Sequence, residues 1–173
     1  MQQSELNEYF STKWKSNVDQ YLYTGWSLID KVKENEWVLD VGCGHNPFKN
    51  KIKNLIGIDP AFDEADYKVT VEDFKFPQKF DVAFCLGSIN FGSKDTIIRQ
   101  ISSVANYLQP NCRIYWRCNP GLKDHGNIEC KDINFFPWSY DLHFEFCDLF
   151  GFECTELKYD VNNRIYAEWE KQS

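Results

Sequence analysis

The stretch Val38-Leu39-Asp40-Val41-Gly42-Cys43-Gly44-His45-Asn46-Pro47 decides the fold of this chain. An apolar run ends in an acid, and two glycines follow where a helix is expected to begin. A second apolar run, Leu55-Ile56-Gly57-Ile58, ends in Asp59, about 20 residues after Asp40. The glycines let the backbone approach a ligand closely, because any Cβ atom would occupy its space. The pattern therefore predicts an adenosine-binding half-site, in which the second acid binds the ribose hydroxyls.

Two kinds of adenosine-containing cofactor compete for this half-site: a dinucleotide and S-adenosylmethionine (SAM). The third glycine of the dinucleotide pattern G-x-G-x-x-G is missing, because Pro47 stands in its place. A dinucleotide needs tight backbone packing around its pyrophosphate, a group that SAM lacks. Pro47 also suits the first turn of a helix, where its missing N–H costs nothing. The sequence therefore favours SAM.

The chain resembles the class I (Rossmann-like) SAM-dependent methyltransferases of the small single-domain type. Residues 39–44 look like the glycine motif of that family, and Ile58-Asp59-Pro60 is similar to its ribose-binding acid. Three later segments follow in the family's order, at 71–77, 79–88 and 107–114. The resemblance spans residues 36–170. It implies a methyltransferase that uses SAM, and it indicates no particular methyl acceptor.

The length and composition are typical of one globular domain. The chain has 173 residues, of which 43% are hydrophobic and 17% aromatic, enough for a packed core. We expect a single SAM-binding domain over 1–173, with an N-terminal helical segment at 1–35 and the Rossmann-like core at 36–173. A dinucleotide-dependent oxidoreductase usually needs a further substrate domain, and this length argues against one.

The charge of the chain bears on its partners. The net charge is −7 and the isoelectric point about 5.0, which disfavours nucleic acid, because phosphate binding relies on Lys and Arg. Lys49, Lys51 and Lys53 form a basic cluster, which we interpret as a solvated helix face. We expect the methyl acceptor to be a small molecule or a protein. The sequence does not indicate an oligomeric state.

The cellular compartment is indicated by two features. Residues 1–5 are polar and no apolar segment typical of a secretory signal follows, nor is any run long enough to cross a membrane. The seven cysteines are odd in number and lack the regular spacing of a disulfide framework. We therefore expect a cytoplasmic protein whose cysteines are reduced, among them Cys85, Cys112 and Cys118 in apolar runs.

The hydrophobic periodicity predicts strands that alternate with helices. Strands are expected at 36–41, 54–59, 67–71, 80–86 and 111–118, and helices at 18–33, 47–53, 94–108 and 138–150, with Ser93 as the N-cap of the third helix. Residues 152–160 and 164–169 alternate like strands on either side of an Asn-Asn turn, which predicts a terminal β-hairpin. The expected fold class is therefore α/β, with a doubly wound, mostly parallel seven-stranded sheet and a C-terminal antiparallel hairpin.

The resemblance assigns roles around the cofactor. It implies that Gly42 and Gly44 line the amino-acid moiety and the ribose, and that Asp40 either holds the ammonium group, directly or through water, or braces the loop. Asp73 would accept a hydrogen bond from the adenine amino group, with Glu72 as its competitor. Phe74 or an adjacent apolar side chain would pack on the adenine ring. The expected cofactor-binding residues are Asp40, Gly42, Cys43, Gly44, Asp59, Pro60, Asp73, Phe74, Leu86 and Ser88.

The acceptor side is expected beyond the fourth and fifth strands, since ligands of open α/β sheets bind at the carboxyl ends of strands. Enzymes that methylate DNA amino groups carry an Asn/Asp-Pro-Pro-Tyr/Phe box after the fourth strand. This chain has Gly87-Ser88-Ile89-Asn90-Phe91 there, which argues against DNA base methylation. Asn90 and Asn119 are candidates for substrate contact, and Trp14 and Trp138 for pocket walls.

His125 is the best candidate for a general base, because the ordinary pKa of histidine lies near neutrality. A rival hypothesis is a zinc site, since several thiol and imidazole groups lie close together in the sequence. Its candidate ligands are Cys118, His125, Cys130, His143 and Cys147. No C-x-x-C pair occurs, so we expect no metal.

A further alternative is a regulatory or scaffold protein that binds SAM or its product without transferring a methyl group. The intact glycines and the two acids, Asp40 and Asp59, argue against a site that has lost its function.

Overall fold

The computed structural model describes residues 2–12, 25–121, 133 and 135–171. Its helices are α1 (Gln3–Thr12), the 3-10 helix η2 (Trp26–Lys31), α2 (Lys94–Asn106) and α3 (Tyr140–Phe150). Its strands are β1 (Val38–Val41), β2 (Leu55–Ile58), β3 (Phe80–Leu86), β4 (Leu108–Cys118), β5 (Phe152–Tyr159) and β6 (Ile165–Lys171). Of the helix expected at 18–33, only the part from residue 25 onward lies among the described residues, where it is the shorter η2.

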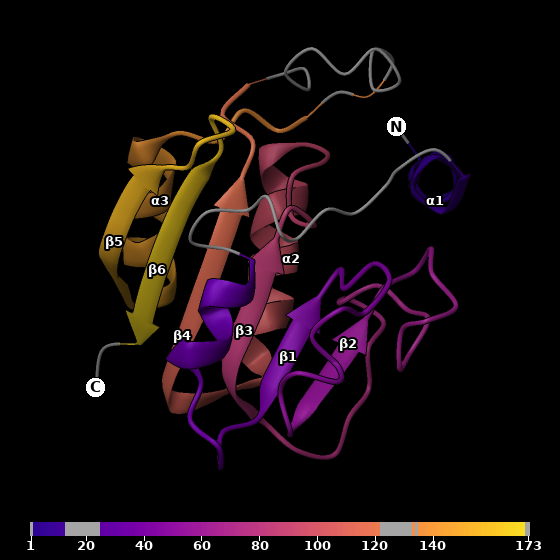
Figure 1. Ribbon diagram of the computed structural model, residues 1–173. Helices are drawn as coiled ribbons and strands as arrows, with labels where there is room; N and C mark the ends of the chain where they lie inside the picture. Colours follow the sequence, from indigo (N-terminus) through magenta and orange to yellow (C-terminus); the bar gives the residue numbers. More distant parts are fainter. Residues whose placement is uncertain (1, 13–24, 122–132, 134, 172–173) are drawn as a thin grey trace.

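The six strands form one sheet in the order β2-β1-β3-β4-β6-β5 (Figure 1). β1 to β4 run parallel, whereas β6 pairs antiparallel with both β4 and β5. This arrangement confirms the expected fold class and the terminal hairpin. The hydrophobic run Phe80–Leu86 forms a central strand, and most of its residues are buried. A parallel strand that is covered on both faces needs such a run.

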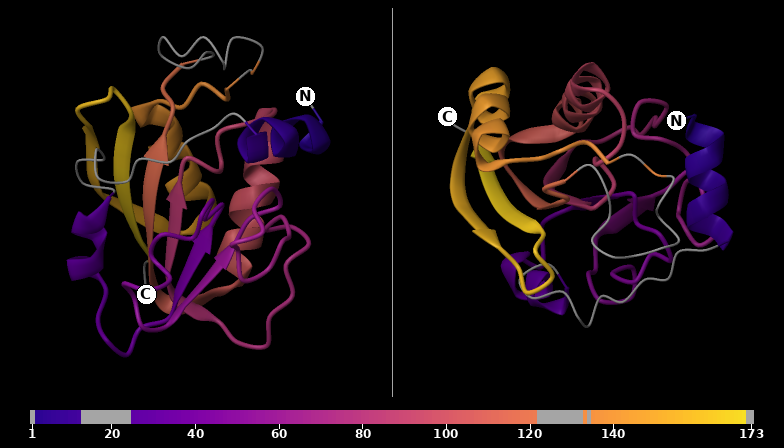
Figure 2. Two further views of the ribbon diagram at one scale, coloured as in Figure 1. Left: turned by 45° about the vertical axis from the view of Figure 1, so that its right-hand side comes forward. Right: turned by 90° about the horizontal axis from the view of Figure 1, so that it is seen from above.

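Helices cover the two faces of the sheet unequally. α2 and α3 lie side by side on one face, and η2 lies on the other (Figures 1 and 2). Ile97, Ile101 and Val104 of α2 are fully buried in the larger core cluster, which also contains Phe146 of α3. Leu28 of η2 is buried in a second cluster on the opposite face. The predicted N-cap is confirmed, since the Ser93 side chain accepts a hydrogen bond from the Thr96 backbone N–H.

The segment expected as a strand at 67–71 is reduced to a single bridge between Tyr67 and Ile58. The carboxylate of Asp66 accepts a hydrogen bond from the Gly57 N–H at 2.8 Å, where a neighbouring strand would offer a carbonyl. The Asp66 side chain therefore takes the place of a strand carbonyl as the hydrogen-bond acceptor for β2. The described part of the chain contains six strands instead of the expected seven.

The helix expected at 47–53 is also different, because these residues form successive turns. The backbone N–H groups of Lys51 and Ile52 both bond to the Phe48 carbonyl, which closes no more than one turn. Asn46, with φ of 59°, lies just before it in the left-handed region. A segment this short gains too few hydrogen bonds to offset the cost of helix nucleation.

The short helix α1 lies apart from η2, beyond the ends of β1 and β2 and near one end of α2 (Figures 1 and 2). Its Leu6 and Tyr9 are buried against Phe91 and Ile133 in a small cluster of their own. Among the described ranges, none of the helices has the length and apolar character that crossing a bilayer would require.

Candidate functional site

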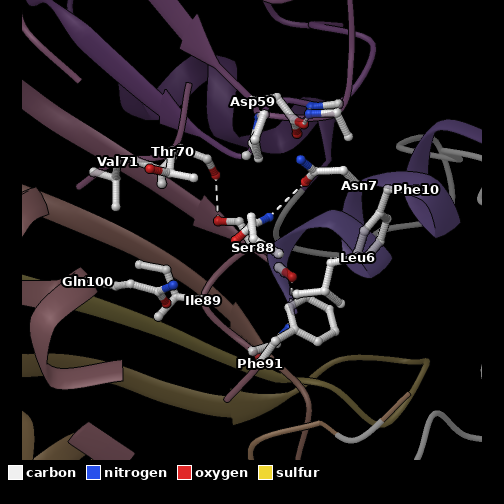
Figure 3. Close-up of a pocket in the computed structure, with 18 of the residues that line it drawn as sticks. Leu6, Asn7, Phe10, Asp59, Thr70, Val71, Ser88, Ile89, Phe91 and Gln100 are labelled. Atoms are coloured by element: carbon white, nitrogen blue, oxygen red, sulfur yellow. Dashed lines mark hydrogen bonds between the residues drawn. The ribbon is translucent and has the colours of Figure 1, made fainter. Parts of the chain in front are cut away.

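A cavity of about 410 Å³ lies at the carboxyl ends of the parallel strands. It is lined by the residues that follow β1, β2 and β3, by the end of β4 and by α1. Figure 3 shows Asp59, Ser88 and Ile89 on its walls, with Leu6 and Phe10 of α1 closing one side. The cavity is therefore located where open α/β sheets bind their ligands.

The turn after β1 is packed against the end of β3. Gly42 has φ of 72°, a left-handed conformation that favours glycine, and its N–H bonds to the Ile58 carbonyl at 2.8 Å. A Cβ atom on Gly42 would lie 2.1 Å from the Cβ of Ser88. The Ser88 hydroxyl in turn donates to the Val41 carbonyl at 2.6 Å. Gly42, Gly44 and Ser88 all line the cavity, as the sequence predicts for a cofactor loop.

Asp59 ends β2 and links it to the glycine turn. One carboxylate oxygen accepts from the Gly44 N–H at 3.0 Å and the other from the Ala61 N–H at 2.8 Å. Burial raises the pKa of this carboxyl, and hydrogen bonds from the backbone of Ala61, Gly44 and Phe62 partly offset the effect. An ionised carboxylate has about four acceptor positions, so Asp59 retains capacity to accept a further hydrogen bond from a ligand in the cavity.

Asp40 is 3% exposed and does not line the cavity. Burial raises the pKa of its carboxyl to about 7, and the negative charge of Asp59 adds to the effect. Cys43 is likewise buried and outside the cavity lining. Asp40 and Cys43, both predicted from the sequence to bind the cofactor, therefore do not reach the cavity.

The end of β3 is joined to the end of β4 by two asparagines. The Asn90 side chain donates to the Gly87 carbonyl at 3.0 Å and accepts from the Asn119 N–H at 3.1 Å. Both asparagines line the cavity, as do Leu86 and Pro60. The structure thus brings Asn90 and Asn119, predicted from separate strand ends, into direct contact.

The expected adenine contacts are distributed differently from the prediction. Glu72 lines the cavity, whereas Asp73 is exposed outside it and Phe74 is buried in the core against Tyr107, with ring centroids 4.9 Å apart. Gln100 of α2 also reaches the cavity, near Ile89 (Figure 3). No role for Gln100 was predicted, because its contribution depends on how α2 packs.

Two arginines line the other side of the cavity, and neither was predicted. Arg117 lies at the end of β4 and Arg164 in the turn before β6. The Arg117 Nε donates to Asp160 at 2.9 Å, and this carboxylate is fully buried. A charged residue inside the apolar run 111–118 was the signal that could have identified Arg117.

Trp138, expected as a pocket wall, is 1% exposed and lies in the core outside the cavity lining. Its indole N–H donates to the Ile89 carbonyl at 2.8 Å, so it supports the cavity from behind. Trp14 and His125 lie outside the described residues.

The candidate zinc ligands that the structure describes lie in apolar surroundings. Cys118 and Cys147 are buried free thiols, and His143 accepts a hydrogen bond from the Trp169 indole at 3.1 Å. Across the described ranges no three His, Cys, Asp or Glu side chains converge as metal ligands. His125 and Cys130 lie outside those ranges.

No protein-family model and no curated protein sequence matches this chain. Several solved structures match it. Magnesium protoporphyrin IX methyltransferase (ChlM) from Synechocystis PCC 6803 with bound S-adenosylhomocysteine aligns with a TM-score of 0.71 and 14% identity, over 98% of this chain and 99% of that chain. The N-methyltransferase NodS from Bradyrhizobium japonicum WM9, in complex with S-adenosylhomocysteine, aligns with a TM-score of 0.63 and 11% identity, over 98% of both chains.

The cyclase SpnF also aligns, with a TM-score of 0.62 and 11% identity, over 84% of this chain and 78% of that chain. The structure thus matches class I SAM-dependent methyltransferases over nearly the whole chain. At these identities the likeness establishes the fold alone. The cyclase illustrates that one fold serves more than one reaction.

Proposed function

We propose that this protein transfers a methyl group from SAM to a small molecule or a protein. The observation that carries this proposal is the hydrogen bond from Gly44 to Asp59, which joins the glycine turn and the acid at one wall of the cavity. The hydrogen bond supports the proposal, because an adenosine with its ribose needs backbone groups and a carboxylate side by side. The fold supports the proposal, since proteins that share it were crystallised with S-adenosylhomocysteine.

The cavity suits SAM better than a dinucleotide. A pyrophosphate is bound by the N–H groups at the N-terminus of a helix, and the segment after the glycine turn forms turns instead of a helix. The charged residues on this side of the cavity are the acids Asp59 and Glu72. SAM carries positive charges on its sulfonium and ammonium groups, so these acids attract SAM and would repel a pyrophosphate.

When bound, SAM supplies a methyl group on a positively charged sulfur. We assign the ribose to Asp59, the amino-acid moiety to the backbone at Gly42 and Gly44, and the adenine amino group to Glu72. Leu86 and Ser88 form the wall at the end of β3 that separates the cofactor from the acceptor. The contribution of the protein is to align the two reactants, and alignment alone accounts for a large part of many rate accelerations. His125 is the candidate base for acceptors that must lose a proton.

The test is calorimetric titration with SAM, with NAD as the control ligand. We expect micromolar binding of SAM and no binding of NAD. Asp59→Ala should weaken SAM binding at least tenfold, because the ribose loses its hydrogen-bond acceptor. The matched control is Asp63→Ala, which removes an exposed acid four residues away that pairs with Lys68. Equal affinities in the two variants would contradict the assignment.

A screen of acceptors for S-adenosylhomocysteine production then tests transfer itself. SAM binding without turnover on any acceptor would favour the alternative, a regulatory or scaffold protein that binds SAM.

A further inference from the structure

Gln100 of α2 carries a buried polar atom that the fold does not use. The side-chain oxygen Oε1 of Gln100 is buried, and within the described part of the chain no donor forms a hydrogen bond with it. Burying an amide oxygen in this way costs free energy, and buried polar groups are therefore nearly always hydrogen-bonded. Gln100 lines the cavity. Its oxygen is thus placed to accept a hydrogen bond from a ligand.

The turn of α2 that carries Gln100 lies beside Glu72. Arg99, which precedes Gln100, has its Nε 3.9 Å from a carboxylate oxygen of Glu72. Glu72 also lines a second cavity together with Ser103, which lies three residues after Gln100 on the same face of the helix. Both Glu72 and Gln100 line the main cavity. Two hydrogen-bond acceptors, one on α2 and one before β3, therefore meet in the same part of this cavity.

Two apolar side chains form the wall next to these acceptors. Val71 and Ile89 line the cavity on the side where Gln100 lies (Figure 3). Both belong to the larger core cluster, together with Ile97 and Ile101 of α2, so their positions are fixed by packing. An apolar wall with a few polar groups at its edge suits a flat ring that carries polar substituents, such as a nucleobase.

We propose, building on methyl transfer from SAM as the function, that Gln100 is a specificity-determining residue that binds the adenine amino group together with Glu72. This amino group has two hydrogens. The Glu72 carboxylate accepts one of them and Oε1 of Gln100 accepts the other, while Nε2 of Gln100 donates to the neighbouring ring nitrogen, as side-chain amides do with adenine. A site with two acceptors selects an unsubstituted amino group and rejects one that carries a methyl group.

Calorimetry with S-adenosylhomocysteine and its N6-methyl analogue tests this selection. We expect the wild-type protein to bind the parent compound at least ten times more tightly than the analogue. Gln100→Ala should weaken binding of the parent about three- to tenfold, because one neutral hydrogen bond is lost. It should also bring the analogue to within about twofold of the parent, because the space of the amide then admits the methyl group. A wild-type protein that binds both compounds equally would overturn the proposal.

Gln100→Met separates ligand recognition from a role in the fold. Methionine has a similar length but no amide, so it removes the buried oxygen that lacks a partner among the described residues. The midpoint of thermal unfolding of the ligand-free variant should equal or exceed that of the wild type, while S-adenosylhomocysteine binding weakens about three- to tenfold. Gln109→Met, at an exposed position of β4, is the matched control and should change neither quantity. A lower midpoint for Gln100→Met would assign Gln100 to the fold and overturn the proposal.

The same titrations distinguish a failure of this inference from a failure of the proposed function. If the wild type and Gln100→Ala bind S-adenosylhomocysteine equally well, the role of Gln100 is refuted and methyl transfer is retained. Adenosine is the further probe. If the wild type binds adenosine in a manner that depends on Gln100, but binds neither SAM nor S-adenosylhomocysteine, methyl transfer is refuted and the adenine site is retained. A wild type that binds none of these compounds refutes both.

Discussion

The backbone N–H of Gly44 lies 3.0 Å from a carboxylate oxygen of Asp59, so the turn after β1 is bonded to the end of β2. The Gly42 N–H also reaches across, to the Ile58 carbonyl at 2.8 Å. Two segments that a ligand must contact together are therefore fixed relative to each other before it arrives. Such preorganisation lowers the entropic cost of binding.

Gly42→Ala is predicted to destabilise the fold strongly. The new Cβ would meet the Ser88 Cβ at 2.1 Å, and φ of 72° is itself strained for alanine. Strain and overpacking together should lower the free energy of unfolding by about 2–4 kcal/mol. Urea denaturation followed by circular dichroism measures the loss.

Gly151→Ala is the matched control for this clash. Gly151 caps α3 with φ of 75°, and its nearest contact is the flexible end of Lys171 at 3.4 Å. It should cost about 1 kcal/mol, from backbone strain alone. Combining Gly42→Ala with Ser88→Gly should restore part of the lost stability. Equal costs at Gly42 and Gly151, with no rescue, would show that the contact with Ser88 is unimportant.

Glu72, and not Asp73, is predicted to recognise the adenine amino group. Glu72 lines the cavity, whereas Asp73 bonds to Thr70 outside it. Glu72→Gln should weaken S-adenosylhomocysteine binding about three- to tenfold, because a charge-assisted hydrogen bond becomes a neutral one. Asp73→Asn is the matched control and should have no effect. The opposite ranking in calorimetry would return the role to Asp73.

Features fixed by neighbours in the chain could be predicted from the sequence. The glycines, the acid after β2 and the Ser93 cap depend on residues within one turn or one strand end. The terminal hairpin was equally predictable, because its alternation and its turn residues agree. All of these features follow locally from the hydrophobic periodicity, the backbone φ angles that glycine allows and the chemistry of helix capping.

Features set by packing between distant segments could not be predicted. Phe74 and Trp138 are aromatic residues beside predicted elements, and nothing local tells whether such a ring faces the cavity or the core. Both are buried because α2, α3 and the chain around Tyr107 cover them. The contribution of α1 to the cavity likewise follows from its contact with Phe91, which is 82 residues from Tyr9 in sequence.

His143 is predicted to make stability depend on pH. Burial lowers the pKa of His143 from 6.5 to about 3, so protons bind first to the unfolded chain. The contribution of His143 is present above pH 6.5 and is lost as pH falls toward 3, at about 1.4 kcal/mol per pH unit. Its cause is the apolar cage of tryptophans, including Trp169, that surrounds the ring.

The comparison with His143→Gln isolates this effect, because glutamine does not titrate and can still accept from the Trp169 indole. Urea unfolding of both proteins over this pH range gives their difference in free energy of unfolding. We expect the advantage of the wild type to shrink as pH falls. A difference that stays constant would mean that His143 is protonated in the folded protein without penalty.

Asp40 is predicted to couple cofactor binding to proton release. Its pKa of about 7 in the folded protein lies above the ordinary 3.8, so its burial lowers stability as pH rises from 3.8 to 7. A cationic ligand favours the charged carboxylate and expels the proton. SAM affinity should therefore increase with pH below about 7 and level off above it, with a slope that approaches tenfold per pH unit.

Calorimetry in buffers with different ionisation enthalpies counts the protons released. We expect the release of most of one proton per bound SAM at about pH 6. At about pH 8 the release should be a small fraction of a proton, because Asp40 is already ionised there. Asp40→Asn should abolish the release, whereas Asp63→Asn, at an exposed acid, should retain it. Binding heats that are the same in every buffer would show that Asp40 keeps its protonation state and is not coupled to cofactor binding.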